Sequence, residues 1–220
     1  MAIKKPVITA EEAAAMVKDG DTIMVSGFWA VGTAEDIMDA LVAQGTKNLT
    51  TSSISHALAT KGVGKLHANR QVKKSIASFI GRHQSAIEQY LNGELEVEFV
   101  PQGTVAERCR AGAFGLGGVL TPTGVGSELA EGKQVINVDG KDYLLETALK
   151  ADVAIIKAHI ADEYGNLRYR YAARNTNPNM AGAAKVTIAQ VDKIVPIGEI
   201  GPDDVHTPDI FVDYLVVKKQ

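Results

Sequence analysis

The feature that most constrains the fold is a repeated order of short apolar run, glycine-containing loop and helical stretch. Residues 22–25 form the first apolar run, residues 27–32 the first loop, and residues 33–44 an amphipathic stretch that Gly45 ends. The same order recurs over residues 75–91, where residues 75–80 are the expected strand, and over residues 95–110, where residues 95–100 are the expected strand. Strands that alternate with helices predict an α/β protein with a mostly parallel open sheet and helices on both faces.

Local signals refine this prediction. Thr9 and Glu12 have the spacing of a helix capping box, and Thr33 is expected to cap the helix that follows the first loop. Residues 134–145 predict an added β-hairpin with a type I′ turn at Asp139-Gly140. Residues 111–126 combine glycine with apolar side chains and predict a packed loop. Further strands are expected at residues 49–52, 151–157, 186–189, 194–197 and 211–217. Because no linker divides the chain, we expect residues 1–220 to form one domain.

Composition excludes several classes of protein. The chain is 45% hydrophobic, which excludes a disordered protein, and its net charge of −3 argues against nucleic acid as a partner. Neither a signal peptide nor an apolar run of membrane-spanning length is visible. The single cysteine, Cys109, excludes an internal disulfide framework and a zinc site of several thiolates. We therefore expect a cytoplasmic protein with no membrane partner.

The first candidate site is the glycine loop between the first strand and its helix. Such a loop presents backbone N–H groups that favour a phosphate, a carboxylate or an oxyanion. The pattern lacks the lysine of a nucleotide P-loop and the spacing of a dinucleotide fingerprint. A tight turn that uses glycine only for its backbone angles is the alternative. The loop consists of Ser26, Gly27, Phe28, Trp29, Ala30, Val31 and Gly32.

The second candidate is Gln102, which we place at the carboxyl end of a strand, where open α/β sheets bind ligands. Its amide can donate a hydrogen bond to a carbonyl oxygen that gains charge during acyl transfer. A turn amide that the backbone satisfies is the alternative. Likewise, the glycines of residues 112–126 indicate close approach to either a ligand or another part of the chain.

A nucleophile or a metal site is harder to find. Ser55 and His56 are neighbours, but no nucleophile-elbow motif surrounds them. The histidines lack metal-ligand spacing, so no metal is expected, and nothing marks Cys109 as activated. The five histidines are His56, His67, His83, His159 and His206. From the residues alone, the chain is a ligand-binding α/β domain without an obvious catalytic group.

Several blocks, in order along nearly the whole chain, carry a resemblance to a known family. The first is the run from Asp19 through Gly32, and the others include Pro101-Gln102-Gly103-Thr104 and Ala173-Arg174-Asn175. Further blocks are residues 93–98, 106–108, 120–126, 151–154 and 177–178. The chain is similar to the α subunits of family I CoA-transferases of the short-chain 3-oxoacid type, such as acetate or butyrate:acetoacetate CoA-transferase.

This resemblance implies a ping-pong reaction that moves CoA from a short-chain acyl-CoA to a free carboxylate. The attacking glutamate belongs to the β subunit, so no catalytic nucleophile is expected in this chain, which ends at Gln220. The implied assembly is a heterotetramer of two α and two β subunits. CoA is then a substrate, and no tightly bound cofactor is expected. The Ser26–Gly32 loop matches the family's CoA-binding segment, and Gln102 matches a glutamine that supports catalysis beside the substrate carboxylate or thioester oxygen.

The chain departs from the family pattern at several positions. The family usually has Gly at the position of Ser26 and Pro at that of Ala34, and Asn followed by Asp or Asn where Ile54 and Ser55 stand. Arg82-His83 replaces a frequent Thr-Asn. In the family, the polar residues at the positions of Ile54 and Ser55 lie near the acyl pocket, and Ile54, Ser55, His56 and Gln102 are the expected substrate-pocket residues.

Two other hypotheses remain open. The chain could be a ligand-sensing or regulatory domain that binds a phosphorylated small molecule on the same scaffold. It could also be a self-sufficient hydrolase that uses Ser55 and His56.

Overall fold

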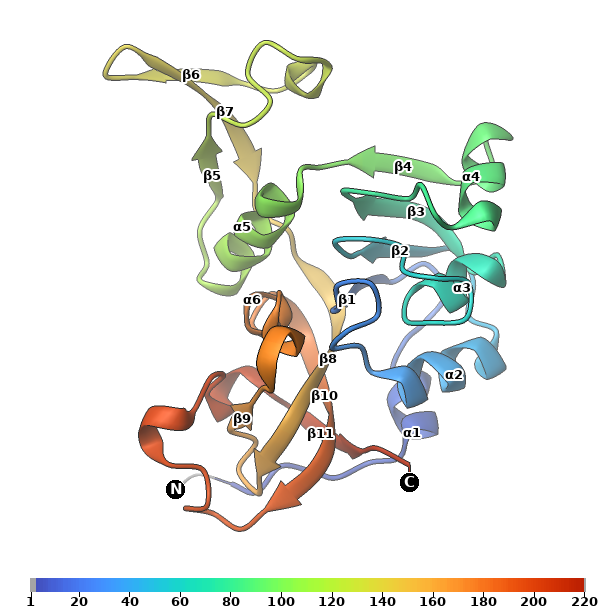
Figure 1. Ribbon diagram of the computed structural model, residues 1–220, viewed down its shortest axis with the longest axis vertical. Helices are drawn as coiled ribbons and strands as arrows, with labels where there is room; N and C mark the ends of the chain where they lie inside the picture. Colours follow the sequence, from blue (N-terminus) through green and yellow to red (C-terminus); the bar gives the residue numbers. More distant parts are fainter. Residues whose placement is uncertain (1–2, 220) are drawn as a thin grey trace.

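The computed structural model describes residues 3–219, and its main element is an eight-stranded sheet. The strands follow the order β11-β10-β8-β1-β2-β3-β4, and every neighbouring pair in this row is parallel (Figure 1). The eighth strand, β9, pairs antiparallel with β8. Their bounds are β1 Thr22–Val25, β2 Leu49–Ser52, β3 Val72–Ala77, β4 Glu96–Phe99, β8 Ala151–Asp162, β9 Leu167–Arg168, β10 Ala184–Val195 and β11 Tyr214–Val217.

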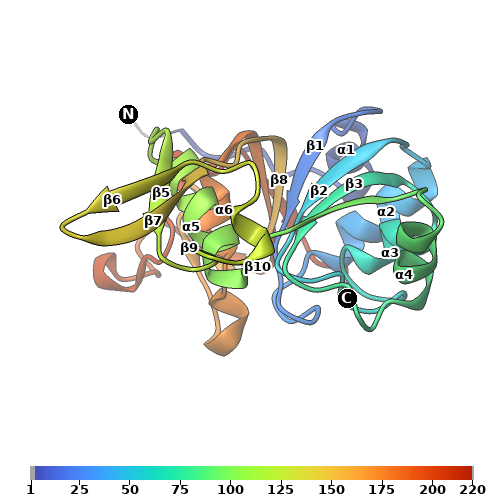
Figure 2. The same ribbon diagram turned by 90° about the horizontal axis from the view of Figure 1, so that it is seen from above.

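Helices cover both faces of this sheet (Figure 2). Alternation along β1 shows why: Ile23 and Val25 pack into one apolar core with α1 to α4, whereas Met24 packs into a second core with α5 and α6. The predicted fold class is therefore confirmed. The helices are α1 Ala10–Ala15, α2 Glu35–Gln44, α3 Gly64–Ala68, α4 Gln84–Leu91, α5 Gln102–Ala113 and α6 Asn177–Ala181. Short 3-10 helices are η1 Glu128–Ala130, η2 Tyr171–Arg174, η3 Pro202–Asp204 and η4 Asp209–Phe211. Within residues 3–219, no helix is long and apolar enough to cross a membrane.

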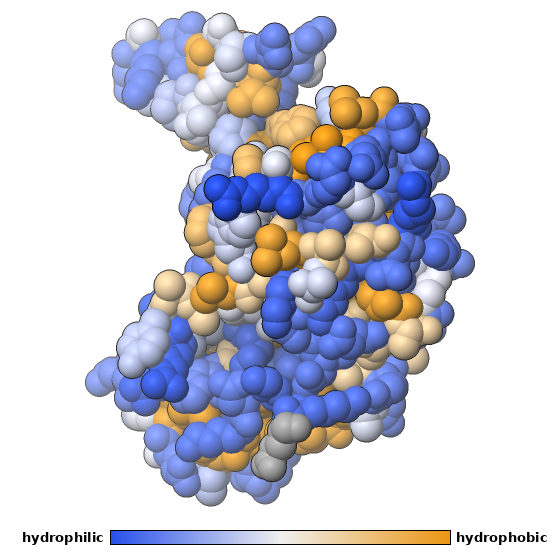
Figure 3. Space-filling model, turned by 45° about the vertical axis from the view of Figure 1, so that its right-hand side comes forward, coloured by the Kyte–Doolittle hydropathy of each residue, from blue (hydrophilic) through white to orange (hydrophobic). Residues whose placement is uncertain are grey.

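Strands β5 (Gly118–Thr121), β6 (Val135–Val138) and β7 (Lys141–Thr147) form a separate antiparallel sheet, which we call the arm. The arm stands off the main sheet as its own lobe (Figures 1 and 3). The predicted hairpin is confirmed, with Asp139 and Gly140 at φ +51° and +78°. The prediction of a packed loop at residues 111–126 is wrong. That segment ends α5, supplies β5 and is mostly exposed, because β7 pairs with it outside the main core.

Three other local predictions need correction. Ala34, and not Thr33, is the N-cap of α2, and the N–H groups of Asp36 and Ile37 donate to Gln190 Oε1 at 3.2 and 3.4 Å. Residues 186–189 and 194–197 do not form two strands, because β10 is continuous through the polar residues between them. The expected strands at residues 75–80 and 211–217 instead span Val72–Ala77 and Tyr214–Val217, so Phe79 and Ile80 lie in the loop after β3.

Candidate functional site

The carboxyl ends of β1 to β4 meet at one edge of the sheet because the four strands are parallel neighbours. The loops that follow them hold the predicted site residues: 26–32 after β1, 53–57 after β2 and 78–83 after β3, with Gln102 after β4. Strands β8 and β10 are each 12 residues long and continue past the end of β1. They form a wall beside the first loop. This edge is where open α/β sheets bind ligands.

The first loop is a tight turn in which two residues other than glycine have left-handed backbone angles. Phe28 and Val31 exchange backbone hydrogen bonds of 3.0 and 2.9 Å, and the residues between them, Trp29 and Ala30, have φ +51° and +66°. Such angles cost about 1–2 kcal/mol for each residue with a Cβ. Backbone strain of this kind persists only where the surrounding structure enforces it, and it is common in functional loops.

Side chains on both sides of the loop hold it in place. Ser26 is buried, and its hydroxyl donates to Gly32 O at 3.1 Å, so it closes the loop instead of facing a ligand. The Asn175 and Asn177 amides donate to Val31 O and Gly32 O at 3.0 and 3.2 Å. Residues at and just before the start of α6 therefore buttress the loop.

The N-terminus of α2 does not offer the anion site that we expected next to this loop. Its first turn carries the carboxylates Glu35 and Asp36, which repel an anion. Gln190 already accepts from two of its N–H groups, and Glu35 accepts from Gly62 N–H at 3.1 Å and pairs with Lys65 at 2.8 Å. The first turn of α2 is therefore occupied by side chains of this protein.

Trp29, Ser55 and His56 line one narrow cavity, too tight in this structure to hold a water molecule, together with residues of the third loop. The Trp29 and Phe79 ring centroids are 6.4 Å apart, and the Arg82 guanidinium lies 5.1 Å from the Trp29 ring centroid. The remaining lining residues are Ala57 and Ile80. The first three loops thus meet at one place, which we call the edge cavity.

Two predicted residues lie elsewhere. Ile54 is 2% exposed and packs in the core with Met24, so its side chain does not line the edge cavity. Gln102 is the exposed first residue of α5 and does not line the edge cavity either. It lies on the same edge of the sheet, three strands from β1.

Behind the edge cavity lies a cluster of three buried histidines that sequence reasoning missed. The rings of His56 and His67 stack with centroids 3.8 Å apart, and His83 meets both edge-on at 6.3 and 5.9 Å. His56 Nε2 is 2.6 Å from Ser75 Oγ, and His83 Nδ1 accepts from Ala86 N–H at 3.1 Å and so caps α4. One sequence signal could have indicated this cluster, because His56 and His83 follow strands β2 and β3, which are neighbours in the sheet.

Burial keeps His56 and His67 of this cluster neutral. It lowers the pKa of His56 to about 3, with His83 contributing, and it lowers the pKa of His67 well below its usual value, with His56 and His83 contributing. The stacked rings of His56 and His67 do not direct their nitrogen atoms at one point where a metal ion could bind. Accordingly, no group of three or more His, Cys, Asp or Glu in residues 3–219 is arranged to hold a metal ion.

The hydrolase hypothesis loses its base in this arrangement. His56 Nε2 bonds to Ser75, not to Ser55, and the low pKa of His56 makes it a weak proton acceptor near neutral pH. Cys109 is no better as a nucleophile, because burial raises the pKa of its thiol to about 12.

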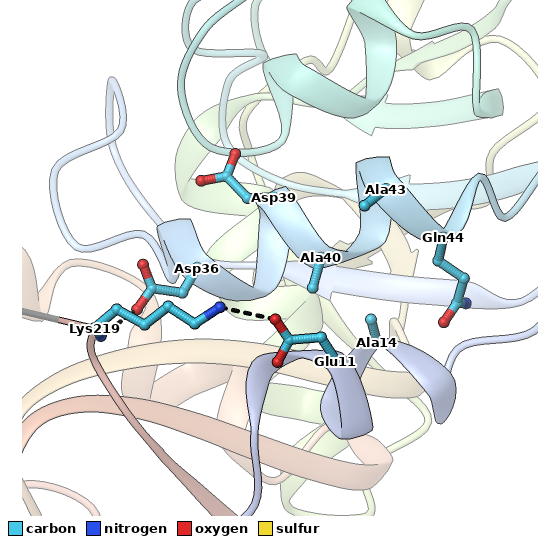
Figure 4. Close-up of a pocket in the computed structure, with 8 residues that line it drawn as sticks. All are labelled: Glu11, Ala14, Asp36, Asp39, Ala40, Ala43, Gln44 and Lys219. Atoms are coloured by element: carbon cyan, nitrogen blue, oxygen red, sulfur yellow. Dashed lines mark hydrogen bonds and ion pairs between the residues drawn. The ribbon is translucent and has the colours of Figure 1, made fainter.

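Several other cavities lie outside the edge cavity. One of about 350 Å³ lies between Gly32 and β8 and is lined by Lys157, His159 and Arg170, with Asp192 2.8 Å from Lys157 Nζ and 2.9 Å from His159 Nδ1. It extends the candidate site on the side of β8. Another lies between α1 and α2 (Figure 4). It contains none of the predicted site residues, and Lys219 already pairs with Glu11 there at 2.8 Å.

Comparisons with known proteins agree with this geometry. The profile of the family described as "Coenzyme A transferase" matches residues 7–218. The chain is 43% identical to the alpha subunit of acetate CoA-transferase of Escherichia coli K12, over 99% of both chains. It is 46% identical to the A subunit of a probable succinyl-CoA:3-ketoacid coenzyme A transferase of Bacillus subtilis, covering 97% of this chain and 90% of the relative. It is also 47% identical to the A subunit of 3-oxoadipate CoA-transferase of Acinetobacter baylyi, covering 97% and 95%.

Solved structures share the fold. Glutaconate coenzyme A-transferase of Acidaminococcus fermentans superposes with a TM-score of 0.85 at 23% identity, over 96% of this chain and 75% of that chain. An acyl-CoA transferase of E. coli O157:H7 superposes with a TM-score of 0.83 at 22% identity, over 98% of this chain but 47% of that longer chain. The chain therefore belongs to the coenzyme A transferase family, in which the relatives it matches over nearly their full length are named as A or alpha subunits.

Proposed function

We propose that this chain is the α subunit of a heteromeric CoA-transferase that moves CoA between a short-chain acyl-CoA and a free short-chain carboxylate. The observation that carries the proposal is that the candidate site presents no activated nucleophile among the described residues. His56 bonds to Ser75, so it does not act as a base for Ser55, and burial raises the pKa of the Cys109 thiol. Relatives that are named as A subunits support a β partner. The proposed assembly is a cytoplasmic heterotetramer of two α and two β subunits, with residues 1–220 as one domain. Its substrate is CoA, and it uses neither a tightly bound cofactor nor a metal.

The proposed reaction proceeds in two symmetrical halves. In the first half, a glutamate carboxylate from the β partner attacks the acyl carbonyl, the C–S bond breaks, and CoA leaves as a thiolate, so that the acyl group and the glutamate remain joined as a mixed anhydride. The thiolate then attacks the glutamyl carbonyl and releases the first acid, which leaves a glutamyl-CoA thioester. A second carboxylate reverses these steps. This chain supplies the Ser26–Gly32 loop to hold CoA and Gln102 to donate to the charged carbonyl oxygen.

The test compares this chain alone with its complex with a β subunit. We expect the purified chain alone to transfer no CoA between acetyl-CoA and butyrate or acetoacetate, whereas the complex transfers it and accumulates an enzyme-bound CoA thioester. Full activity of the lone chain contradicts the proposal, as does a stable complex that is inactive with a panel of short-chain acids. A phosphorylated ligand bound tightly by a chain that ignores CoA would support the ligand-sensing alternative, which no observation currently favours.

Gln102 provides a prediction within the complex. Replacing it with alanine should lower kcat by about 100-fold, the usual effect of removing one donor to a charged oxygen. Gln84 is the matched control, because it is also the exposed first residue of a helix that follows a strand of this sheet. Gln84→Ala should leave kcat within about twofold, as is usual for surface substitutions. Equal effects of the two substitutions would contradict the role of Gln102.

A further inference from the structure

Strand β5 is an edge strand of the arm, and one of its two sides is unpaired. The arm has the strand order β5-β7-β6, so β5 pairs only with β7. Ala148 N–H donates to Gly117 O at 3.0 Å, and residues of an antiparallel pair turn their backbone groups alternately toward the partner strand and away from it. The N–H and C=O groups of Gly118 and Leu120 therefore point away from β7. Within residues 3–219, no backbone hydrogen bond from another element reaches them.

A groove of about 490 Å³ runs along this free edge, between β5 and α5. Val119, Leu120 and Thr121 all line it. Because consecutive residues of a strand point to opposite faces, a groove lined by three of them in a row follows the edge of the strand and not one of its faces. The opposite wall is α5, which contributes Gly103 and Arg110 among others. The unpaired backbone groups of β5 therefore face an open groove.

Nothing on β5 itself discourages another strand from pairing with it. The strand contains neither a charged residue nor a proline, and Leu120 is exposed. Proteins usually protect a free edge with charges, with proline or with a covering segment, and an unprotected edge is a template for strand addition. The edge strand of the main sheet, β4, has such protection, because it carries Glu96 and Glu98. The free edge of β5 therefore fits an extended segment of another chain.

The groove begins at the candidate site. Pro101 and Gly103, on either side of Gln102, both line it. In the proposed reaction the partner's glutamate attacks a carbonyl group that Gln102 polarises, so the partner chain must reach this point. The first and last elements, α1 and β11, lie at the opposite end of the molecule from the arm (Figure 1), so neither of them approaches the groove. A second copy of this chain would bring no activated nucleophile to Gln102, whereas a β subunit does.

We propose that an extended segment of the β subunit adds to the free edge of β5 and becomes the fourth strand of the arm. This inference rests on the proposed function, which supplies the partner and its glutamate. Main-chain hydrogen bonds to Gly118 and Leu120 hold the segment, and the groove between β5 and α5 accommodates its side chains. Strand addition fixes the partner at the end of the groove that Gln102 adjoins, so the arm positions the nucleophile relative to the site.

The test measures the affinity of the β subunit for variants of this chain. Leu120→Pro removes the outward N–H and leaves the hydrogen bonds to β7 in place, so the lone variant should fold. It should raise the Kd for the β subunit by about 10- to 100-fold, because a C=O group of the added strand loses its donor. Leu120→Ala keeps the N–H and should raise the Kd by less than about fivefold, as is usual when one interface side chain is truncated.

Val135→Pro is the matched control at the other edge of the arm. Gln134 O accepts from Leu145 N–H at 2.9 Å, so the N–H of Val135 faces away from β7, as that of Leu120 does. Val135→Pro should leave the Kd within about twofold, because no partner strand is expected at β6. Denaturant unfolding of each lone variant checks that the fold is retained.

Amide hydrogen exchange, read by NMR, gives a second measurement without any substitution. The N–H of Leu120 should exchange quickly in the lone chain and slowly in the complex with the β subunit. The N–H of Val119 is the internal control, because it faces β7 and should be protected in both states.

Several results would overturn the inference. An unprotected Leu120 N–H in a complex that transfers CoA rejects strand addition and leaves the proposed function intact. Equal weakening by Leu120→Pro and Val135→Pro also rejects it. Protection of Leu120 N–H in the lone chain, through a dimer that Leu120→Pro dissociates, assigns the edge to a second copy. If the complex forms but transfers CoA to no acid, the proposed function fails, and the exchange of Leu120 N–H still decides the inference. If no complex forms, both are wrong.

Discussion

Replacing Gly32 with alanine is expected to reduce both the stability of the protein and its CoA transfer with a β subunit. Gly32 has φ +78°, and a Cβ at this position would lie 2.5 Å from Ala173 O and 2.8 Å from Asn175 Nδ2. The left-handed angle costs a residue with a Cβ about 1 kcal/mol. Relieving the clash adds about 1–3 kcal/mol, because a backbone carbonyl cannot swing away as a flexible side chain can.

Activity should fall more than stability alone explains. The residues that clash with the new methyl group belong to the segment that holds the loop through Asn175 and Asn177. The loop would therefore move relative to its support, and Trp29 would move with it. A displacement of about 1 Å at a reacting site can cost about 100-fold in rate. We expect kcat/KM to fall by at least about tenfold at temperatures where the variant remains folded.

Gly45 is the matched control for this substitution. It has nearly the same angle, φ +76°, but no atom lies within 4 Å of a Cβ built there. Gly45→Ala should lose only about 1 kcal/mol and keep its activity. Denaturant unfolding and steady-state kinetics of both variants make the comparison. If Gly32→Ala is as stable and active as Gly45→Ala, the buttress has no structural importance.

The arrangement of the candidate site at one sheet edge was predictable because it follows from topology. Once residues 22–25, 49–52 and 75–80 were assigned as parallel strands, the loops after them had to lie together. The glycine pattern singled out the loop that contains Trp29, and the family resemblance assigned Ser55 and His56 to the substrate pocket; the structure brings all three to one cavity. The sequence could not separate Ile54 from Ser55, since neighbouring residues of a loop point in different directions and only packing decides which enters the core.

Contacts between distant residues could not be predicted in this way. Gln190 takes the role expected of Thr33 at the start of α2, although more than 150 residues separate it from the helix. Threonine is a preferred N-cap residue, but Thr33 follows the tight turn of residues 28–31 directly, and the N-cap of α2 is Ala34. The continuity of β10 was hidden for a related reason. Polar residues in its middle interrupt the apolar pattern, and one of them is Gln190 itself.

The arm illustrates a different limit. Its hairpin was readable from the Asp139-Gly140 turn, because turn chemistry is local. Its position was not, since nothing in residues 111–126 distinguishes an apolar segment packed in this chain from one that projects into solvent. Phe114 is 64% exposed there. Composition predicts that apolar side chains will be covered, but not which surface covers them.

Acidification from pH 7 to pH 5 is expected to destabilise the protein through the buried histidines. In the folded protein, burial lowers the pKa of His56 to about 3, whereas in the unfolded chain the usual value is about 6.5. Between these values the unfolded state binds more protons than the folded state, so the free energy of unfolding falls as the pH falls below about 6.5. For His56 alone the loss at pH 5 is about 2 kcal/mol. The lowered pKa of His67 acts in the same direction.

The pH window separates this effect from the usual acid unfolding. The carboxyl groups with lowered pKa values, Glu11, Asp152 and Asp192, lose their contribution to stability only below their ordinary pKa values, near pH 4. Between pH 7 and pH 5 the buried imidazoles should therefore dominate the change of the free energy of unfolding with pH.

Urea unfolding at steps of half a pH unit measures this slope, and histidine NMR signals should show His56 and His67 still neutral at pH 5. His56→Asn should reduce the slope by about one proton bound on unfolding, even if the variant is less stable overall. A flat free energy of unfolding from pH 7 to pH 5, or an imidazolium signal from the folded His56 at pH 5, would contradict the burial of neutral His56 and His67 behind the edge cavity.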